Sequence, residues 1–196
     1  MDMKENDSLR NRLIIAGIDE IYTHGISDFS LRRVAAACNT SCAAPYKHFQ
    51  NKEQLILKIV EYINTKWELL SDEIISLYAD DVKKQLLEVS MAYIRFWIAN
   101  PDFRSVFKES HNGMDIRNTK FRNILDGYFD SKSLSDEEKR IRKYGICAIV
   151  HGTISMIESK VAENEKETFE ITRRILTDIL TADKQKEDKK TVDEKV

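Results

Sequence analysis

The segment from Leu31 to Leu55, LRRVAAACNTSCAAPYKHFQNKEQL, decides the fold of this 196-residue chain. Its first part predicts a short helix, because Ser30 is a favourable N-cap residue. Phe29 and Val34 occupy the two positions of a hydrophobic staple, which supports the same helix start. We expect this helix to end near Cys38.

A tight turn and a second short helix are expected next. Asn39 tolerates the left-handed conformation that a helix exit requires. Thr40 or Ser41 can then cap a helix of about two turns that ends at Phe49. Pro45 lies at the edge of the first turn, where at most one helical hydrogen bond is lost. Two such helices joined by three or four residues form a helix-turn-helix.

The flanking sequence predicts helices on both sides of this motif. Two adjacent i+4 rows of apolar residues indicate an amphipathic helix from Leu9 to about His24, closed by Gly25. Asn51 opens a long helix with 3.6-residue periodicity to about Tyr78. Apolar spacing predicts further helices at about 81–100, 101–110, 116–128, 135–163 and 169–180. Asp80 or Asp81 caps the first of these, and Ser135-x-x-Glu138 is a capping box for the fourth. We therefore expect an all-α fold of about nine helices.

Composition agrees with long helices and short connections. The chain has 42% hydrophobic residues, enough for a core, and only 6 Gly and 2 Pro for turns. Its formal net charge of −2 excludes a uniformly basic coat, so any nucleic-acid contact has to come from a local basic face. No apolar run approaches the length of about 18 residues that spans a membrane, and no signal peptide is recognised. We expect a cytoplasmic protein without membrane contact.

Enzymatic and metal-binding motifs are missing from the sequence. There is no phosphate loop, no G-x-S-x-G and no H-E-x-x-H, so we expect neither catalysis nor a cofactor. Three cysteines, Cys38, Cys42 and Cys147, form no C-x-x-C pair, and no metal site is expected. Free cysteines are more often small core residues than thiol sensors, and the sequence leaves the redox activity of these three open.

The segment from Leu31 to Leu55 resembles the DNA-binding segment of TetR/AcrR transcription regulators. The marks are Val34-Ala35, a short turn, Tyr46-x-x-Phe49 and then Asn51-Lys52-Glu53 before an apolar residue. The resemblance covers roughly residues 9 to 60. Asn39, Thr40 and Pro45 depart from the common pattern. The run Ala43-Ala44-Pro45-Tyr46 is similar to one branch of the family.

Members of that branch often carry a His-Gly pair on a dimerisation helix. His151-Gly152 matches this pair, whereas Cys147 stands where a tryptophan is expected. The resemblance implies a homodimer in which the last two long helices of each copy form a four-helix bundle. It implies three regions: a DNA-binding domain at 1–50, a helical effector-binding and dimerisation domain at 51–182, and a charged, disordered tail at 183–196.

The resemblance also implies which residues face double-stranded DNA. Small residues at the tip of the second helix allow close approach, and Ala44 and Pro45 can touch thymine methyl groups. Arg32 is placed at a base or phosphate contact, and the direction of its neighbour Arg33 stays open. The expected DNA-contacting residues are Ser30, Arg32, Ser41, Cys42, Ala43, Ala44, Tyr46, Lys47, His48 and Lys52.

A repressor that binds a palindromic operator and releases it with a small, apolar or aromatic effector is the function these features favour. Candidate pocket residues are Trp97, Phe107, Tyr128 and His151, although aromatic residues at helical spacing are more often core, and His151 suits an interface equally. Two alternatives remain at this stage. One is an architectural, chromosome-associated protein without an effector, and the other is a helical protein-interaction module.

Overall fold

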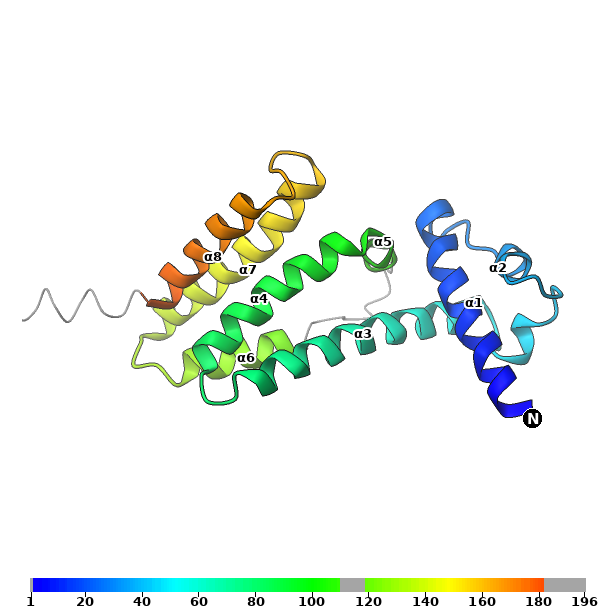
Figure 1. The fold of residues 1–196 in the computed structure, drawn as a ribbon, viewed down its shortest axis with the longest axis horizontal. Coiled ribbons are helices and arrows are strands. Elements are labelled where there is room, and N and C mark those ends of the chain that lie inside the picture. The colour runs from blue at the N-terminus through cyan, green and yellow to red at the C-terminus, as the bar shows by residue number, and fades with distance from the viewer. Residues whose placement is uncertain (1, 110–118, 182–196) are drawn as a thin grey trace, which may run out of the picture. The chain divides into compact units, whose positions relative to one another are not determined.

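The computed structural model describes residues 2–109 and 119–181, and over these it contains eight α-helices, one 3₁₀ helix and no strand (Figure 1). The all-α prediction is confirmed, with a helix count close to the expected nine. The chain divides into two compact units. One takes in the described parts of Met1–Leu69 and Ala99–Ile116, and the other those of Leu70–Ile98 and Arg117–Val196.

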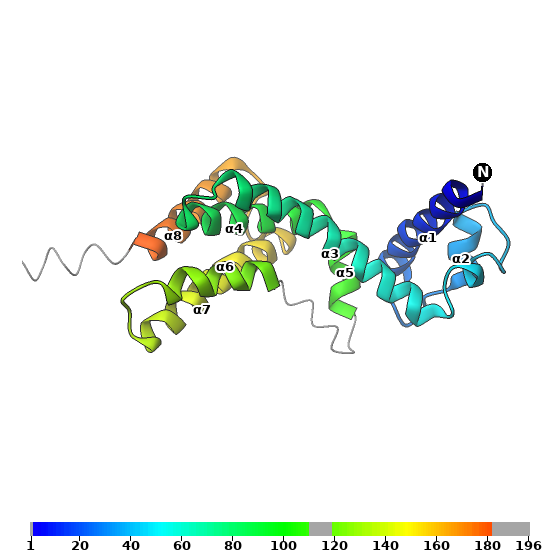
Figure 2. The same ribbon diagram turned by 90° about the horizontal axis from the view of Figure 1, so that it is seen from below.

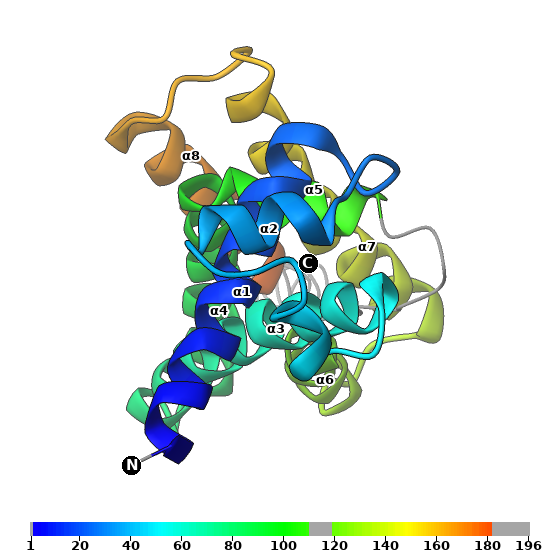
Figure 3. The ribbon, with the colours of Figure 1, turned by 90° about the vertical axis from the view of Figure 1, so that its right-hand side faces the viewer.

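The first unit is built around one N-terminal helix. Its elements are α1 (Asp2–His24), α2 (Leu31–Ala37), the 3₁₀ helix η1 (Pro45–Lys47), the first part of α3 (Lys52–Leu77) and α5 (Pro101–Glu109). α1 packs against both α2 and α5, and Figure 3 views α1, α2 and the start of α3 together. Leu13 and Ile21 of α1, Val34 of α2 and Leu55 of α3 are fully buried, so apolar contact fixes the motif on its neighbours.

The second unit is a layered group of helices. It contains the end of α3, most of α4 (Val82–Ala99), and then α6 (Thr119–Asp130), α7 (Asp136–Glu158) and α8 (Lys166–Thr181). α7 packs against α8 on one side and against α6 on the other (Figures 1 and 2). Its core includes Leu86, Met91, Ile146 and Leu176, all with almost no exposed surface.

The helix caps predicted at Ser30, Asn51, Asp81 and Ser135 are present. The cap predicted at Thr40 or Ser41 is not, since η1 follows Ala44 and has no side-chain cap hydrogen bond. The Asn51 side chain accepts a hydrogen bond from the backbone N–H of Gln54 at 2.8 Å. Asp81 receives the N–H of Lys84 at 2.9 Å. Ser135 forms the full capping box with Glu138, in which each side chain accepts from the other residue's backbone N–H. Local sequence therefore determines where these helices begin.

Some boundaries differ from the expectation. α7 ends at Glu158 and not near Glu163, because Ser159 caps it and Lys160 adopts a positive φ of 58°, which no helix continues. The predicted domain boundary between residues 50 and 51 separates a DNA-binding domain from an effector-binding domain. The two compact units are defined by contacts instead, and α3 is divided between them. The predicted domain boundary therefore stays a prediction. The loop expected at 111–115 and the tail at 183–196 lie outside the described residues.

No helix in the described ranges is both long and apolar enough to pass through a membrane.

An ion pair links α4 to α8 inside the second unit. Nη1 and Nη2 of Arg173 donate to the two carboxylate oxygens of Glu88 at 2.5 and 2.9 Å. This hydrogen bonding, opposed by partial burial, lowers the pKa of Glu88 from its ordinary value. Because the carboxyl has a lower pKa folded than unfolded, the pair stabilises the fold at neutral pH, and that contribution is lost as pH falls below about 4.

Arg173→Met is expected to reduce the free energy of unfolding at neutral pH by about 1 kcal/mol, since both partners are partly exposed. The difference from wild type should vanish in acid, where Glu88 is protonated in both proteins. Urea unfolding across a pH series measures it, with Lys166→Met as the control because Lys166 pairs with Glu170 in full exposure. A deficit that persists unchanged at low pH would contradict the role of this pair.

Candidate nucleic-acid interface

The first helix of the motif ends in the turn that the sequence predicts. The N–H of Thr40 donates to the carbonyl of Ala35, and the N–H of Asn39 donates to that of Ala36, both at 3.0 Å. Asn39 has a φ of 52°. These two bonds and the left-handed residue form a Schellman motif, which satisfies the last carbonyls of α2. The chain then leaves α2 at a fixed angle.

The second helix of the motif is shorter than predicted. The structure contains a single 3₁₀ turn, Pro45–Lys47, where a two-turn helix ending at Phe49 was expected. With Ser41 as cap, the first helical bond would run from residue 45 to the carbonyl of Ser41, and Pro45 has no N–H to make it. Instead, the N–H of Ala44 donates to the carbonyl of Ser41 at 2.9 Å, which forms a tighter turn. The missing donor therefore changes the helix type as well as removing one bond.

We call residues 41–48 the reading segment. Its exposed side chains are those of Ser41, Cys42, Ala43, Tyr46 and Lys47, and that of His48 is half-buried. Tyr46 has 60% of its surface exposed, although it follows the buried Pro45 directly.

Burial separates the core positions of this segment from the candidate contacts. Phe49 is buried beneath the segment, as predicted for a core residue, and the Arg10 guanidinium lies 5.6 Å from the centroid of its ring. Ala44 has only 5% of its surface exposed, and Pro45 is also buried. Burial therefore disfavours the expected contacts of Ala44 and Pro45 with thymine methyl groups.

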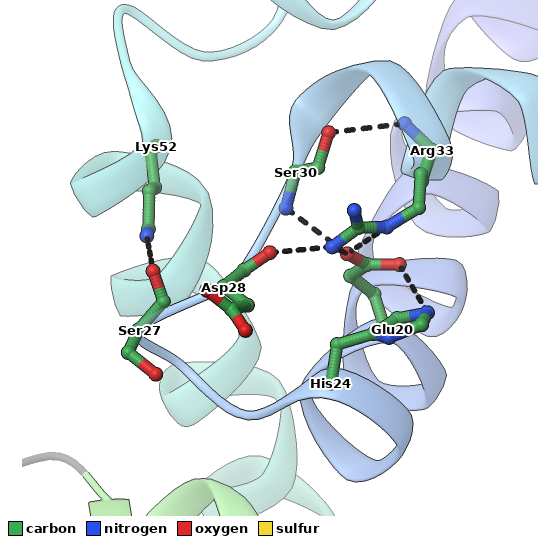
Figure 4. Close-up of polar contacts among 7 residues, drawn as sticks. All are labelled: Glu20, His24, Ser27, Asp28, Ser30, Arg33 and Lys52. Carbon is green, nitrogen blue, oxygen red and sulfur yellow. Dashed lines mark hydrogen bonds and ion pairs between the residues drawn. The ribbon is translucent and has the colours of Figure 1, made fainter.

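Lys52 occupies the start of α3 and reaches toward the loop before α2. Its Nζ donates to the carbonyl of Ser27 at 3.4 Å (Figure 4). The same atom lies 5.9 Å from the centre of the Phe29 ring. An ammonium carries three donors, so this contact leaves donors for a phosphate. The side chain is half-buried, which limits the directions in which those donors point.

A buried carboxylate of α1 organises the start of α2. Glu20 is 7% exposed, and its Oε1 accepts from the backbone N–H of Ser30 at 3.0 Å and from Nε of Arg33 at 2.7 Å (Figure 4). Nη2 of Arg33 also pairs with Glu20 and donates to the carbonyl of Asp28. Nε2 of His24 lies 3.8 Å from the second carboxylate oxygen. The hydrogen bond with Glu20 raises the pKa of Arg33.

Sequence reasoning missed Glu20. Its position relative to Leu13 and Gly17 places it in the i, i+4, i+7 register of the buried face of α1. A charged residue in that register has to be paired, because an isolated buried carboxylate is costly. The position of Glu20 on the buried face of α1 therefore indicates from sequence that a cation pairs with it.

Three of the predicted effector residues, Trp97, Tyr128 and His151, belong to the second unit, and Phe107 belongs to α5 of the first. Trp97 and His151 both meet the ring of Tyr93 edge to face, with centroids 5.8 Å apart in each pair, and Phe121 stacks on Tyr93 at 5.8 Å. We call these four residues the Tyr93 cluster. Trp97 is buried, whereas His151 is exposed. The cluster thus runs from the core to the surface.

Tyr128 is not part of this cluster. The hydroxyl of Tyr128 donates to the backbone carbonyl of Leu180 at 3.0 Å, and its ring packs on Phe129, which is the pattern of a satisfied core tyrosine. Phe107 belongs to α5, but its side chain is outside the described part of the structure.

The cysteines lie in unlike surroundings. Burial raises the pKa of the thiols of Cys38 and Cys147, which lowers their thiolate fraction and their reactivity, whereas Cys42 is exposed in the reading segment. Within residues 2–109 and 119–181, no three His, Cys, Asp or Glu residues gather in a way that could hold a metal ion.

The sequence and the fold were compared with those of known proteins. Residues 13–59 match the family described as bacterial regulatory proteins, tetR family. A TetR family transcription regulator from Marinobacter aquaeolei is 18% identical, with a TM-score of 0.73 over 90% of this chain and 97% of that one. The regulator FadR of Bacillus subtilis, solved in complex with stearoyl-CoA, is 14% identical, with a TM-score of 0.59 over 87% and 97%.

A third solved structure agrees. The TetR family regulator PfmR from Thermus thermophilus is 17% identical, with a TM-score of 0.62 over 86% of this chain and 97% of that one. A search of curated proteins gave no match. At these identities the solved structures establish the fold, and the matched segment contains the helix-turn-helix with its exposed cations.

Residues 13–59 therefore match the tetR family of bacterial regulatory proteins, and the chain is a DNA-binding transcriptional regulator.

Proposed function

We propose that the chain represses transcription in the cytoplasm as a homodimer that binds a palindromic operator and releases it when a small apolar molecule binds. The observation that carries the DNA-binding part is the exposure of Arg32, Tyr46 and Lys47 on one helix-turn-helix whose apolar side is buried. A chain with a net charge of −2 needs such a local cationic face to meet phosphates.

The proposed contacts follow the exposure of each side chain. The hydroxyl of Tyr46, the ammonium of Lys47 and the ring N–H of His48 are donors suited to phosphates and base edges. Ser30, Ser41, Cys42 and Ala43 border them, and their small side chains let the backbone approach the duplex closely. Lys52 adds a cation at the N-terminus of α3, where backbone N–H groups also favour an anion.

Removing a cation that neutralises a phosphate is expected to weaken binding and to flatten its salt dependence. For Lys47→Ala, the slope of log K against log salt should fall by about 0.9 for each phosphate that is no longer neutralised. Fluorescence anisotropy with the DNA upstream of the protein's own gene, across a salt series and against shuffled DNA, measures both quantities. Lys66→Ala is the matched control, since Lys66 is an exposed lysine of α3 beside Tyr62.

Equal slopes for Lys47→Ala, Lys66→Ala and wild type would show that Lys47 neutralises no phosphate. Tight binding that prefers the upstream DNA to its shuffled form would instead establish a sequence-specific regulator.

A dimer is proposed because one motif offers few phosphate contacts and because α7 and α8 expose an apolar groove. The groove has a volume of about 400 Å³, and the Thr153 and Thr172 hydroxyls, 3.3 Å apart, join the two helices beneath it. Met156 and Ile171 on its sides are about half exposed. Its lining residues are Ala148, Ile149, Gly152, Thr153, Met156, Ala162, Thr168, Ile171, Thr172 and Ile175.

The occupant we propose for this groove is the same face of a second copy. A two-fold pairing of α7 and α8 buries apolar side chains from both copies and produces two reading segments related by symmetry. Two related segments match a palindrome whose half-sites lie about one helical turn, or a multiple of it, apart.

Ile171→Glu is expected to raise the dimer dissociation constant by about a hundredfold, because an unpaired charge in an apolar interface costs about 3 kcal/mol. Sedimentation equilibrium measures the constant. Leu77→Glu is the control, since Leu77 is an exposed apolar residue of α3 that does not line the groove. A wild-type monomer, or an Ile171→Glu protein that dimerises as tightly as wild type, would refute the proposal.

For the effector we propose the Tyr93 cluster, which combines the buried ring of Trp97 with the exposed ring of His151. Rings that extend from the core to the surface suit an apolar ligand that enters from solvent. FadR of Bacillus subtilis was solved with stearoyl-CoA, which makes a long-chain acyl-CoA the first ligand to test.

In a Trp67→Phe protein Trp97 is the remaining tryptophan, and stearoyl-CoA is expected to change its fluorescence and to weaken DNA binding. Linkage requires that DNA weaken stearoyl-CoA binding by the same factor. Coenzyme A without the acyl chain is the control. Fluorescence that responds equally to coenzyme A and to stearoyl-CoA would exclude an acyl-chain effector at this cluster.

A further inference from the structure

Two adjacent arginines of α2 have different surroundings. Both side chains are exposed, but Arg33 is also tied to α1 through Glu20 and to the preceding loop through the carbonyl of Asp28 (Figure 4). Both carry the charge that a phosphate would attract, and the family resemblance left the direction of Arg33 open. The contacts of Arg33 in the structure supply that direction.

Glu20 needs cationic and N–H partners because it is a buried carboxylate. It is 7% exposed and accepts from two groups of the α2 start, the Ser30 backbone N–H at 3.0 Å and the Arg33 Nε at 2.7 Å. Nε2 of His24 lies 3.8 Å from the second oxygen of this carboxylate. A buried carboxylate that loses its partner is strongly destabilising, so moving Arg33 away carries a free-energy cost.

The guanidinium of Arg33 also spans two structural elements. Nε faces the Glu20 carboxylate of α1, and Nη2 reaches both that carboxylate and the Asp28 carbonyl of the loop. A planar fork with fixed donors makes both contacts at once, which a lysine ammonium on a flexible chain does not reproduce. The start of α2 is thereby fixed on α1 by a side chain as well as by apolar packing.

We infer that Arg33 is a positioning residue of the DNA-reading motif: its ion pair with the buried Glu20 orients α2 on α1 and withholds its charge from DNA, which leaves Arg32 as the DNA-facing arginine. This inference rests on the DNA-binding function. It assigns different roles to two neighbouring cations, and it makes Glu20, which has almost no exposed surface, a determinant of DNA affinity.

The test uses the full-length protein and a fluorescein-labelled duplex of mixed sequence, so that phosphate contacts dominate. Arg32→Gln should lower the salt slope by about 0.9 for each phosphate that is no longer neutralised. Arg33→Gln and Glu20→Gln should each lower affinity several-fold. Arg33→Gln should leave the slope unchanged, whereas Glu20→Gln, which releases the Arg33 charge, should not lower it. Because both break one interaction, the double variant should lose no more affinity than either single variant.

Substitution by lysine gives the sharpest distinction. Arg32→Lys keeps a cation for the phosphate and should bind this duplex nearly as wild type does. Arg33→Lys also keeps the charge but not the two-sided contact with Glu20 and Asp28, and it should bind as weakly as Arg33→Gln. Its melting temperature should also fall, whereas that of Arg32→Lys should not.

Nuclear magnetic resonance of the wild-type protein tests, without a variant, whether Arg32 or Arg33 contacts DNA. The Arg33 Nε–Hε signal should be protected from exchange and unchanged when DNA saturates the protein, and the Arg32 signal should shift. This measurement applies even where an Arg33 variant fails to fold.

Three results would overturn this inference alone: an Arg33→Gln slope as low as that of Arg32→Gln, an Arg33→Lys protein that binds as wild type does, or an Arg33 signal that shifts with DNA. A wild-type protein that binds no duplex at low salt would overturn the DNA-binding function itself, and the inference with it.

Discussion

The helix-turn-helix depends on the hydrogen bonds that the Glu20 carboxylate accepts from Ser30 and Arg33. Apolar packing of Val34 and Leu55 brings the motif onto α1, but apolar contact is not directional. Hydrogen bonds to Ser30 and Arg33 supply the direction that packing lacks. A DNA-reading surface needs such direction, because base edges and phosphates accept donors only within a narrow geometry.

Two backbone features complete the motif after α2 is fixed. The Schellman motif around Asn39 sets the angle at which the chain leaves α2. Pro45, which lacks an N–H, converts the following helix into a 3₁₀ turn. The reading segment consequently presents Tyr46 and Lys47 from a compact turn, close to the buried Phe49.

Local features of this fold were predictable from sequence, and contacts between distant residues were not. The caps at Ser30, Asn51 and Ser135 were predicted because a cap involves residues three positions apart. The Glu20–Arg33 pair was missed because its partners are 13 residues apart and meet only when α2 folds onto α1. The predicted DNA contacts and pocket residues remain proposals, because side-chain chemistry names donors and rings but not the ligand they meet.

The Glu20–Arg33 contact also bears on how freely this reading head can be exchanged between scaffolds. A transplant of residues 31–55 alone would carry the cation without the carboxylate, since Glu20 lies outside that stretch. The guanidinium would then be released from its tether and would compete for whatever anion is nearest. Positions 20 and 33 therefore act as one structural unit, and a chimaera that follows the borders of residues 31–55 would divide it.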